Sequence, residues 1–351
     1  MKIMHVTWGL SPGGTENLIV DVANEQAKSA IVTILIINDK VDNSLLAQVA
    51  EPVKILRINR KLKTKSIIDQ LKIIAIILKH RPHILHLHHY GLYRLVKFAK
   101  LIGIPTCLTV HSTHYPCIDL DKHRHIFSIS ETTRLDLLKK CGAKATTITN
   151  GINCESIRKK GDTHWNSGEP FRIVQVGRLQ HSVKGQHILL FALRTLIDDY
   201  QITNFTLDFI GTGESTDWLQ GLTHKLQLQQ HCRFLGEQSR ATIYNNLADY
   251  HLLIQPSLFE GFGLTMIEAM TAKVPTLASD IDAPKEILQN GRLGFMFKNS
   301  NPNSLARQLA YLITKYNQTE IQNTIANAYS HTVTNFDVNS TAQKYLQMYI
   351  N

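Results

Sequence analysis

The sequence lacks the features of a membrane-spanning or disulfide-rich protein. No stretch reaches the roughly eighteen consecutive apolar residues that a membrane-spanning helix needs, and lysines bound the densest apolar run, residues 73–78. The five cysteines are odd in number and form no C-x-x-C pair. This usage argues against both a disulfide framework and a zinc site, and it is typical of a reducing cytoplasm.

The N-terminal segment also lacks the full pattern of a signal peptide. It reads MKIMHVTWGL, with one lysine and a short apolar run that is interrupted by His5 and Thr7. The breaker sequence SPGG follows directly. We therefore expect a first β-strand here rather than a cleaved leader.

The chain contains enough apolar material for two globular domains. It has 351 residues, of which 43% are hydrophobic and 19% charged. Apolar runs of four to eight residues alternate with segments of helical period, which predicts βαβ units and parallel sheets. We expect helices near residues 15–29, 66–80, 91–102, 131–140, 184–200, 215–229, 239–249 and 264–273, and again from about 301 onward.

The periodicity disappears between residues 153 and 170, where polar and helix-breaking residues predominate. We therefore predict a linker there, between two doubly wound, Rossmann-like α/β domains at residues 1–165 and 166–330. Ligands of such sheets bind beyond the carboxyl ends of the strands. We expect the two domains to face each other across a cleft, with the chemistry in the loops that follow the strands.

Net positive charge is confined to the first half of the chain. Residues 1–168 hold 24 Lys and Arg against 13 Asp and Glu, whereas the remaining residues hold 14 against 15. The densest part, KILRINRKLKTK at residues 54–65, has six basic residues and no acid. Such a patch suits an anionic membrane surface, a nucleic acid, or solvent alone. Aromatic residues do not interleave with the basic ones, which argues against nucleic acid.

Two loops in the first half carry residues suited to a ligand. In WGLSPGGTENL, Gly13 and Gly14 let the backbone approach a ligand, and the helix start that follows attracts an anion. This turn is not G-x-G-x-x-G, and a purely structural turn is the alternative. In LTVHSTHY, His111 ends a strand, where it can hydrogen-bond a sugar-sized ligand; a structural role is the alternative.

A group of histidines follows another strand, in the sequence HILHLHHY. It contains His86, His88 and His89, but no acidic or cysteine partner stands at ligand spacing. The chain has 17 histidines, so a local group of them is weak evidence for a metal. We expect no metal site.

The loop after the strand FRIVQV carries two cations. Arg178 follows Gly177 at the strand end, and Lys184 precedes Gly185 at a helix start. A planar guanidinium and a compact ammonium six residues apart fit a diphosphate. The alternative is a surface loop with two exposed bases.

The stretch PSLFEGFGLTMIEAM combines glycines, carboxylates and a helix start. Backbone N–H groups of Gly263, Leu264 and Thr265 are expected at or before that start, where they can bind phosphate or sugar oxygens. Glu260 and Glu268 cannot bind phosphate favourably, so we expect them to hold hydroxyl groups. Hydroxyls at both ends with a diphosphate between them describe a nucleotide sugar.

The motif VGRL…KG followed by PSLFEGFGLTMIEAM resembles the retaining nucleotide-sugar glycosyltransferases of family 4, the glycosyl transferases group 1. Glu260 and Glu268 match that family's pattern of two glutamates separated by seven residues, and VPTLASD, EIL, NGI and HLHH look like its other segments. The resemblance runs from the first strand to about residue 300. It implies the two-domain GT-B fold, with a C-terminal helix at residues 331–351 that returns to the first domain.

The resemblance also implies roles for individual residues. Arg178 and Lys184 would bind the donor diphosphate and stabilise charge on the leaving group. Glu268 would hold the ribose hydroxyls, and Glu260 and His111 would contact the transferred sugar. The catalytic set would be His111, Arg178, Lys184 and Glu260. The other donor-binding positions would be Gly13, Gly14, Gly213, Leu235, Gly236, Glu237, Gly261, Phe262, Gly263, Leu264 and Thr265.

Two positions depart from the family pattern. Lys273 stands where the motif A-x-G-x-P commonly has glycine, and Asp282 and Ala283 stand where a Gly-Gly pair is common. These differences bear on the shape of the donor loop, and so on which sugar is used.

The implied reaction moves a sugar from a nucleotide-diphosphate sugar, a UDP-sugar by expectation, to a hydroxyl of a glycan or lipid-linked acceptor, with retention at the anomeric carbon. Bacterial cell-surface polysaccharide or lipopolysaccharide synthesis is the expected setting. No cofactor or metal is expected, because Arg178 and Lys184 supply the positive charge. We interpret two D-x-D strings, at 119–121 and 280–282, as coincidental. A nucleotide-sugar epimerase of the same fold and a non-catalytic nucleotide-sugar-binding subunit are the rival functions.

The acceptor is expected on the first domain, with its excess of positive charge. Residues 54–80 combine a basic segment with an amphipathic helix, which suits docking on an anionic membrane. We therefore expect a cytoplasmic protein attached peripherally to the inner face of the cell membrane. The alternative is that this helix simply faces the core.

Overall fold

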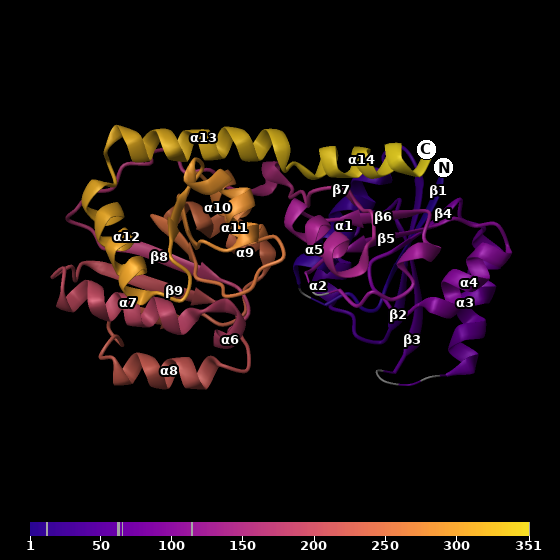
Figure 1. The fold of residues 1–351 in the computed structure, drawn as a ribbon, viewed down its shortest axis with the longest axis horizontal. Helices are drawn as coiled ribbons and strands as arrows, with labels where there is room; N and C mark the ends of the chain where they lie inside the picture. The colour runs from indigo at the N-terminus through magenta and orange to yellow at the C-terminus, as the bar shows by residue number, and fades with distance from the viewer. Residues whose placement is uncertain (12, 62–63, 65, 114, 351) are drawn as a thin grey trace. The chain divides into compact units, whose positions relative to one another are not determined.

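The computed structural model describes residues 1–11, 13–61, 64, 66–113 and 115–350. Within them the chain forms two compact units (Figure 1), Met1–Asn153 with Phe336–Asn351, and Cys154–Asn335. The boundary between the units lies between Asn153 and Cys154, before the boundary expected at residue 165, so most of the linker expected at residues 153–170 belongs to the second unit. The chain re-enters the first unit at Phe336 and ends there as a helix.

The first unit is built on a seven-stranded parallel sheet. The strand order is β3-β2-β1-β4-β5-β6-β7, which reverses direction at β1 as a doubly wound sheet does. Strand β2 has six consecutive buried residues, as expected where helices cover both faces. The strands are β1 (Lys2–Thr7), β2 (Ile31–Asn38), β3 (Lys54–Arg60), β4 (Ile84–Leu87), β5 (Thr106–Val110), β6 (His125–Ser128) and β7 (Thr146–Thr147).

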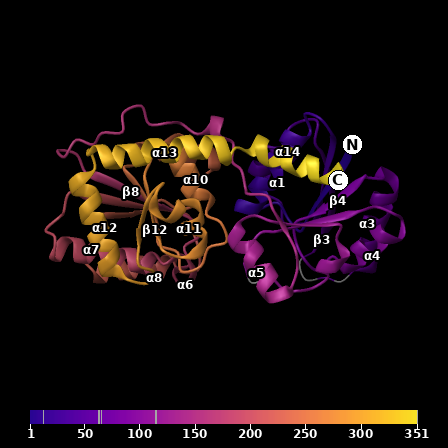
Figure 2. The same ribbon diagram turned by 45° about the horizontal axis from the view of Figure 1, so that its top comes forward.

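Helices cover this sheet on both faces (Figure 2). α1 packs against α14 on one face, and α3 packs against α4 on the other. Alternation along β1 sends Met4 and Val6 to the cluster with α3 and α4, and Ile3 to the cluster with α14. The helices are α1 (Gly14–Gln26), α2 (Asn43–Leu46), α3 (Ile67–His80), α4 (Tyr93–Leu101), α5 (Glu131–Cys141) and α14 (Val338–Ile350), with a 3-10 turn η1 (Leu120–Lys122).

The segment NGI explains how α14 is attached. Ile152 donates its N–H to the Phe336 carbonyl at 2.8 Å and accepts from the Val338 N–H at 3.0 Å. A Cβ on Gly151 would lie 2.6–2.8 Å from atoms of the α14 start, including Oγ1 of Thr341. Only a glycine lets the chain pass this close to the helix, so this part of the motif serves the fold.

The second unit holds a six-stranded parallel sheet in the order β10-β9-β8-β11-β12-β13. Its strands are β8 (Phe171–Val176), β9 (Phe205–Ile210), β10 (Cys232–Phe234), β11 (Leu252–Gln255), β12 (Thr276–Ser279) and β13 (Phe295–Phe297). Its helices and 3-10 turns are η2 (Cys154–Ser156), α6 (His181–Lys184), α7 (Gln186–Asp198), α8 (Thr216–Lys225), α9 (Arg240–Asn246), η3 (Leu247–Asp249), α10 (Leu264–Thr271), α11 (Asp282–Ile287), η4 (Gln289–Gly291), α12 (Pro302–Lys315) and α13 (Thr319–Asn335).

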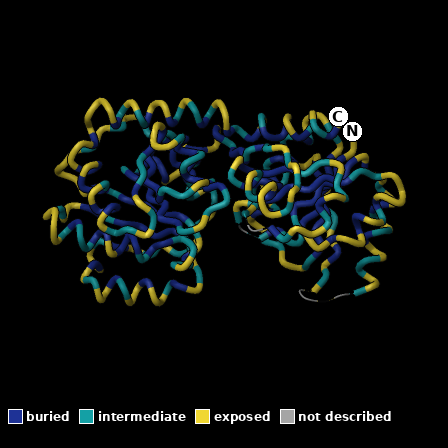
Figure 3. The backbone as a smooth tube through the Cα atoms, in the orientation of Figure 1, coloured by how far each residue is buried: buried dark blue, intermediate teal, exposed yellow. Residues whose placement is uncertain are grey.

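The core of the second unit lies mainly between its sheet and helices α7 and α12. Helices α7 and α12 pack against each other, and Leu189 and Leu193 of α7 are fully buried in one cluster with Leu305 and Leu309 of α12. Figure 3 shows the strands of each unit in dark blue and the outer turns of the helices in yellow. The carboxyl ends of the strands and the loops that follow them are thus set on a rigid support.

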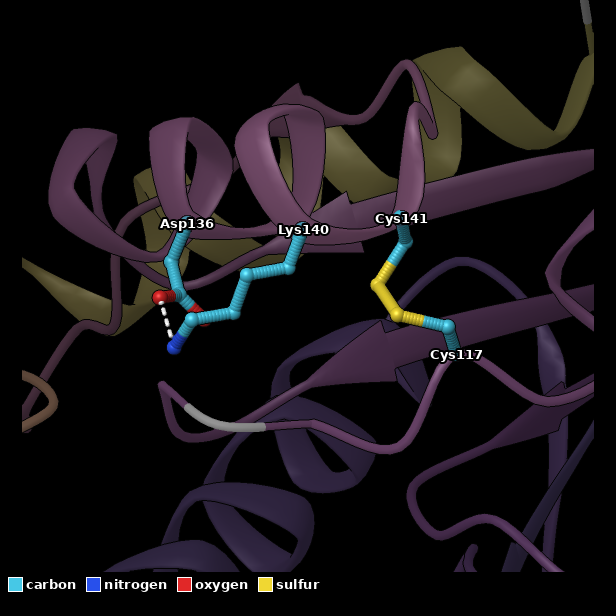
Figure 4. The surroundings of a disulfide bond; sticks show 4 residues. All are labelled: Cys117, Asp136, Lys140 and Cys141. Carbon is cyan, nitrogen blue, oxygen red and sulfur yellow. Dashed lines mark ion pairs between the residues drawn. A yellow bond between two sulfur atoms is a disulfide. The ribbon is translucent and has the colours of Figure 1, made fainter.

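A disulfide joins Cys117, in the loop after β5, to Cys141, at the end of α5 (Figure 4). The expectation that the cysteines form no disulfide is therefore wrong for this pair. The two residues are 24 apart in sequence, and only the fold brings their Cα atoms to 5.3 Å. The thiols of Cys107, Cys154 and Cys232 are buried.

No helix in the described part of the chain has both the length and the apolar content needed to cross a membrane. Leu62, Lys63 and Lys65, which belong to the basic stretch at residues 54–80, lie outside the described residues.

Candidate active site

The loop between β8 and α6 carries Arg178, the first of the two predicted cations. Its carbonyl oxygen accepts a hydrogen bond from Nε2 of Gln186 at 2.9 Å, which ties the loop to the start of α7. The Arg178 side chain is exposed, and its guanidinium has no hydrogen bond or ion pair with any described residue. It is therefore available to an anion.

Lys184, at the end of α6, forms an ion pair that the sequence pattern does not predict. Its Nζ lies 2.7 Å from Oε2 of Glu260, and these side chains are only 23% and 13% exposed. The same Oε2 accepts hydrogen bonds from Nε2 of Gln255 at 2.9 Å and from Oγ of Ser257 at 3.3 Å. Oε1 of Glu260 accepts none from the residues that the structure describes. One carboxylate oxygen is thus fixed by the protein, while the other can accept from a ligand.

Gly185 makes this ion pair possible. Its φ is 66°, and a Cβ there would lie 1.9 Å from the carbonyl oxygen of Pro256. A larger residue would force α6 away from the loop that carries Glu260. A backbone hydrogen bond of 2.9 Å, from Leu258 to Val183, holds the two segments together on the other side of the turn.

Helix α10 begins directly after Gly263, whose φ of 110° suits glycine. A Cβ on Gly263 would lie 2.3 Å from the terminal methyl of Met266. The N–H groups of the first turn have no acceptor within a helix, so Leu264 and Thr265 can offer theirs to an anion. Oγ1 of Thr265 donates to Oε1 of Gln255 at 3.2 Å, which joins the helix start to the network around Glu260.

Glu268 lies further along α10 and has a different partner. It accepts a hydrogen bond from the hydroxyl of Tyr244 at 3.2 Å. Tyr244 is buried on α9, and the guanidinium carbon of Arg240 lies 4.9 Å from the centre of its ring. The Tyr244 hydroxyl thus contacts Glu268, whereas Lys184 contacts Glu260.

The glycine loops after β9 and β10 pack beside the Arg178 loop. A Cβ on Gly211 would lie 2.2 Å from the Gly177 carbonyl oxygen, and one on Gly213 would lie 2.3 Å from that of Leu179. Gly211 donates its N–H to the Gly236 carbonyl at 2.8 Å. The predicted positions Leu235, Gly236 and Glu237 thus adjoin the same strand ends as the two cations, while Gly261 and Phe262 lie between Glu260 and α10.

One departure from the family pattern has a structural meaning. Lys273 has a φ of 59°, a left-handed conformation that glycine adopts most readily. The backbone therefore keeps the shape of the turn, and the lysine ammonium lies 5.1 Å from the centre of the Tyr329 ring. Asp282 and Ala283 form the first turn of α11.

In the first unit, Gly13 and Gly14 lie where β1 leads into α1. Gly14 is the first residue of the helix, and a Cβ on Gly13 would lie 2.7 Å from Oε2 of Glu16. Asn17 donates its N–H to the Gly13 carbonyl at 3.0 Å, which closes the first turn. The predicted helix start is therefore present.

His111 follows β5 and is half-buried. It lies at the end of a row of imidazoles on one face of the first sheet, in which His5, His86 and His88 are buried. Nδ1 of His5 lies 3.0 Å from Nε2 of His88, and Nδ1 of His88 lies 3.1 Å from Nε2 of His111. On the other side, Nε2 of His5 lies 2.8 Å from Oε1 of Gln26, which comes from α1. His111 is therefore the last member of a hydrogen-bonded chain that crosses the sheet.

Helix α14 supplies a second set of partners to the same face. The Tyr349 hydroxyl lies 2.5 Å from Nδ1 of His86, and Nε2 of His86 lies 2.7 Å from Oγ1 of Thr109. That oxygen lies 3.1 Å from the Tyr345 hydroxyl. The C-terminal helix thus completes the hydrogen bonding of the histidine row.

Burial keeps these imidazoles neutral. It lowers the pKa of His5 to about 4 and that of His111 to about 3. It also lowers the pKa of His86 and of His88 well below the ordinary value. Each ring therefore carries one N–H and one accepting nitrogen near neutral pH.

The row includes three nitrogens that could approach a metal ion. His5, His86 and His88 each offer one ligand atom, and these atoms lie within 4.8 Å of one another. Every ring nitrogen of the three already has a hydrogen-bond partner. Hydrogen bonding thus accounts for the cluster, and the absence of a metal stays a prediction.

The structure adds residues that sequence reasoning did not select. Gln255, Ser257 and Tyr244 hold the two glutamates, and Gln26 anchors the histidine chain. No motif marks these positions. The period of two between His86 and His88 is the one available signal, because it places both side chains on one face of a strand.

Comparison with known proteins assigns both units to glycosyltransferase families. A family model described as Glycosyltransferase Family 4 matches residues 12–156, and one described as Glycosyl transferases group 1 matches residues 158–331. The phosphatidyl-myo-inositol mannosyltransferase of Mycobacterium leprae is 24% identical over 66% of this chain and 64% of its own length. The glycogen synthase of Mycobacterium tuberculosis is 26% identical over 61% of this chain and 56% of its own length. The chain thus spans less than two thirds of these curated relatives.

Solved structures share the fold over almost the whole chain. HepE of Anabaena, crystallised with UDP and glucose, superposes with a TM-score of 0.81 and 20% identity, covering 99% of both chains. WaaG, described as a glycosyltransferase involved in lipopolysaccharide biosynthesis, gives 0.75 and 13% identity, again covering 99% of both. Two parallel Rossmann-like sheets with these neighbours define the GT-B fold. The chain belongs to the glycosyltransferases, with a family 4 domain followed by a group 1 domain.

Proposed function

We propose that the protein is a retaining, metal-independent glycosyltransferase that uses a nucleotide-diphosphate sugar, with UDP as the favoured nucleotide. The observation that carries this proposal is the pairing of Lys184 with one oxygen of Glu260, on a loop that also carries Arg178, whose exposed guanidinium has no partner among the described residues. This loop region offers two cations for a diphosphate and one carboxylate oxygen for sugar hydroxyls.

The two cations have distinct duties in this proposal. Arg178 provides a planar fork for the diphosphate, and Lys184 provides a point charge that Glu260 holds in position. As the bond from the anomeric carbon to the phosphate oxygen breaks, negative charge grows on the diphosphate, and both cations stabilise it. The same charges make a metal unnecessary.

The two glutamates bind hydroxyl groups at different ends of the donor. Oε1 of Glu260 accepts from hydroxyls of the transferred sugar, and Glu268 accepts from the ribose hydroxyls beside Tyr244. The N–H groups at the start of α10 and the glycine loops around Gly213 and Gly236 line the rest of the donor site. His111 contacts the transferred sugar, and Gly13 and Gly14 approach the phosphate.

The ligands and substrates of similar proteins support a nucleotide-sugar donor and a glycan or lipid-linked acceptor by analogy. HepE binds UDP, glucose and UDP-glucose in its crystals. A relative is a mannosyltransferase of phosphatidyl-myo-inositol, and WaaG takes part in lipopolysaccharide biosynthesis. We extend from these an acceptor hydroxyl on a glycan or lipid-linked molecule of the bacterial cell surface.

Substitution of Glu260 tests the division of roles. Glu260→Ala removes the sugar-facing oxygen and releases Lys184 from its ion pair. We expect the variant to lose discrimination among nucleotide sugars, while Arg178 and the released Lys184 still bind the free nucleoside diphosphate. Titration calorimetry with UDP and UDP-glucose measures both. Equal loss of both ligands would refute the division.

Two rival functions have separate signatures. A nucleotide-sugar epimerase turns over its donor without an acceptor, whereas a transferase releases nucleoside diphosphate only when an acceptor or water receives the sugar. A non-catalytic binding subunit binds the donor and does neither. The protein is incubated with the nucleotide sugar, with and without a membrane extract as the source of acceptor, and the products are analysed. The products distinguish a transferase, an epimerase and a non-catalytic binding subunit.

We also propose that α3 docks on the cytoplasmic face of an anionic membrane. Its outward face is apolar, with Ile67, Ile68, Leu71 and Leu78 exposed by 69%, 66%, 59% and 46%. Lys72 and Lys79 are exposed on the same face. The alternative, a helix that turns its apolar face only to the core, does not account for these exposed residues. Apolar insertion with flanking lysines fits an anionic lipid surface.

Flotation with vesicles of phosphatidylglycerol and phosphatidylcholine at low salt tests this docking. We expect the wild type to float and Leu71→Glu to float less. Leu135→Glu is a matched control, because Leu135 is 50% exposed on α5 of the same unit and should leave flotation unchanged. A wild type that stays unbound would rule out the membrane role.

A further inference from the structure

The hydrogen-bonded chain that ends at His111 has a direction. It runs from Oε1 of Gln26 to Nε2 of His5, from Nδ1 of His5 to Nε2 of His88, and from Nδ1 of His88 to Nε2 of His111, over distances of 2.8, 3.0 and 3.1 Å. His5 and His88 are buried and His111 is half-buried, and among the described residues no carboxylate pairs with any of the three, so the rings are neutral. Each therefore donates through one nitrogen and accepts through the other.

The Gln26 amide presents its oxygen to His5 and leaves its Nε2 buried without a partner among the described residues. With the amide placed this way, its oxygen can only accept, and this fixes every proton along the row of imidazoles. His5 must carry its proton on Nε2 to donate to Gln26, which leaves its Nδ1 as an acceptor. His88 must then donate from Nε2, and His111 must do the same in turn. The proton of His111 thus points back into the chain, and its Nδ1 keeps a lone pair.

The structure shows the consequence at the end of the chain. Nδ1 of His111 is buried and has no hydrogen-bond partner among the residues that the structure describes. A buried lone pair of this kind is costly unless an N–H or O–H group reaches it. The chain therefore prepares His111 to accept a hydrogen bond and not to give one.

We propose that Gln26, His5 and His88 are positioning residues that fix the tautomer of His111, so that Nδ1 accepts a hydrogen bond from a hydroxyl of the transferred sugar. The contact between His111 and a sugar hydroxyl rests on the proposed function. The direction of the hydrogen bonds from His111 to Gln26 does not rest on it, because this direction is a property of the protein without any ligand. In this arrangement His111 cannot donate to a phosphate oxygen or act as an imidazolium, which restricts it to recognition of a hydroxyl.

The tautomers can be measured directly on the intact protein. Long-range ¹H–¹⁵N correlation of protein labelled with ¹⁵N-histidine distinguishes a protonated Nε2 from a protonated Nδ1. We expect the wild-type protein, free of ligand, to carry the proton on Nε2 at His5, His88 and His111. A proton on Nδ1 of His111 would mean that the amide of Gln26 points the other way, and would overturn the proposal.

The variant Gln26→Met tests whether the amide sets the direction. Methionine is close in size but provides no accepting oxygen, so we expect His88 and His111 to populate both tautomers. His251 lies in the second unit, where its Nδ1 accepts from the Arg172 N–H at 2.9 Å, and its signal is the internal control. If the tautomers of His88 and His111 stayed unchanged in this variant, Gln26 would not be the residue that fixes them. The wild-type measurement decides the direction even if this variant does not fold.

Addition of UDP-glucose and of UDP tests the ligand step, with binding followed separately by thermal shift. We expect UDP-glucose to move the His111 Nδ1 resonance and UDP to leave it unchanged, because only the former brings sugar hydroxyls. Binding of UDP-glucose without any change at Nδ1 would overturn the sugar contact. If neither compound bound, the ligand step would fail together with the UDP-sugar form of the proposed function, while the tautomer result would stand.

Discussion

The carboxylate of Glu260 shows how much a single side chain depends on its exact neighbours. Lys184, Gln255 and Ser257 all converge on Oε2, so the chemistry left to Glu260 lies on Oε1. The sequence pattern anticipates a cation and a carboxylate with different ligands. The structure instead joins them, so that one side chain orients the other before any donor is considered.

The buried histidines predict how stability depends on pH. The pKa of His5, of His89 and of His123 is lowered to about 4 and that of His111 to about 3, in each case chiefly by burial. The unfolded chain binds protons at these groups near pH 6.5, and the folded chain does so only near pH 4 or below. The folded state is therefore fully stabilised above pH 6.5 and loses stability as the pH falls from 6.5 toward 4.

Urea unfolding at pH 8, 7 and 5 measures this dependence. We expect the free energy of unfolding to change little between pH 8 and 7 and to fall by several kcal/mol, on the order of 1 to 2 for each buried histidine, by pH 5. Unfolding free energies that stayed constant from pH 8 to pH 5 would contradict the burial of uncharged imidazoles.

At the scale of elements, the short helix α6 owes its place to one glycine. We expect Gly185→Ala to lower the free energy of unfolding by at least about 2 kcal/mol, because alanine disfavours the left-handed backbone and its methyl would meet the Pro256 carbonyl. It should also separate Lys184 from Glu260.

Gly221→Ala on α8 is the control. Nothing lies within 4 Å of a Cβ added there, and we expect this substitution to raise the free energy of unfolding by roughly 0.5–1 kcal/mol. Chemical denaturation of both variants checks the pair, and equal effects would be inconsistent with this packing.

The disulfide between Cys117 and Cys141 ties the loop after β5 to the end of α5. Closing a loop of this length restricts the unfolded chain and stabilises the folded state by about 3 kcal/mol. We expect a reducing agent to lower the free energy of unfolding of the wild type by that amount. The double variant Cys117→Ser/Cys141→Ser should be less stable from the start and insensitive to the reagent. A wild type unaffected by reduction would exclude the bond in solution.

The elements themselves follow from the sequence more completely than their contacts do. Alternating apolar runs and helical segments suffice to predict parallel sheets, and α3, expected at 66–80, is observed at Ile67–His80. The helix expected at 184–200 is observed as α7, Gln186–Asp198, and the sequence pattern does not predict the short helix α6 that precedes it; Gly185, in a left-handed conformation, separates the two. The disulfide and the Gln26–His5 contact join residues far apart in the chain, and local patterns carry no information about such pairs.

At the scale of the whole molecule, the two units differ in charge and in the work proposed for them. The positive charge lies in the first, with the exposed apolar face of α3, and the loops with paired cations and carboxylates lie in the second. Family models that match each unit separately agree with this division. In this proposal the first unit binds the acceptor and docks on the membrane, and the second unit makes most of the contacts with the donor.

The central claim is that Arg178 and Lys184 bind the diphosphate of a nucleotide sugar. A thermal-shift panel of the common UDP-, GDP- and ADP-sugars tests it on the wild type, on Arg178→Met and Lys184→Met, and on Lys225→Met, an exposed lysine of α8, as control. We predict that at least one compound raises the Tm of the wild type and of Lys225→Met, since a ligand at 100 Kd stabilises by about 2.7 kcal/mol, and that the shift is largely lost in the other two variants. A wild type that no nucleotide sugar stabilises would contradict the account.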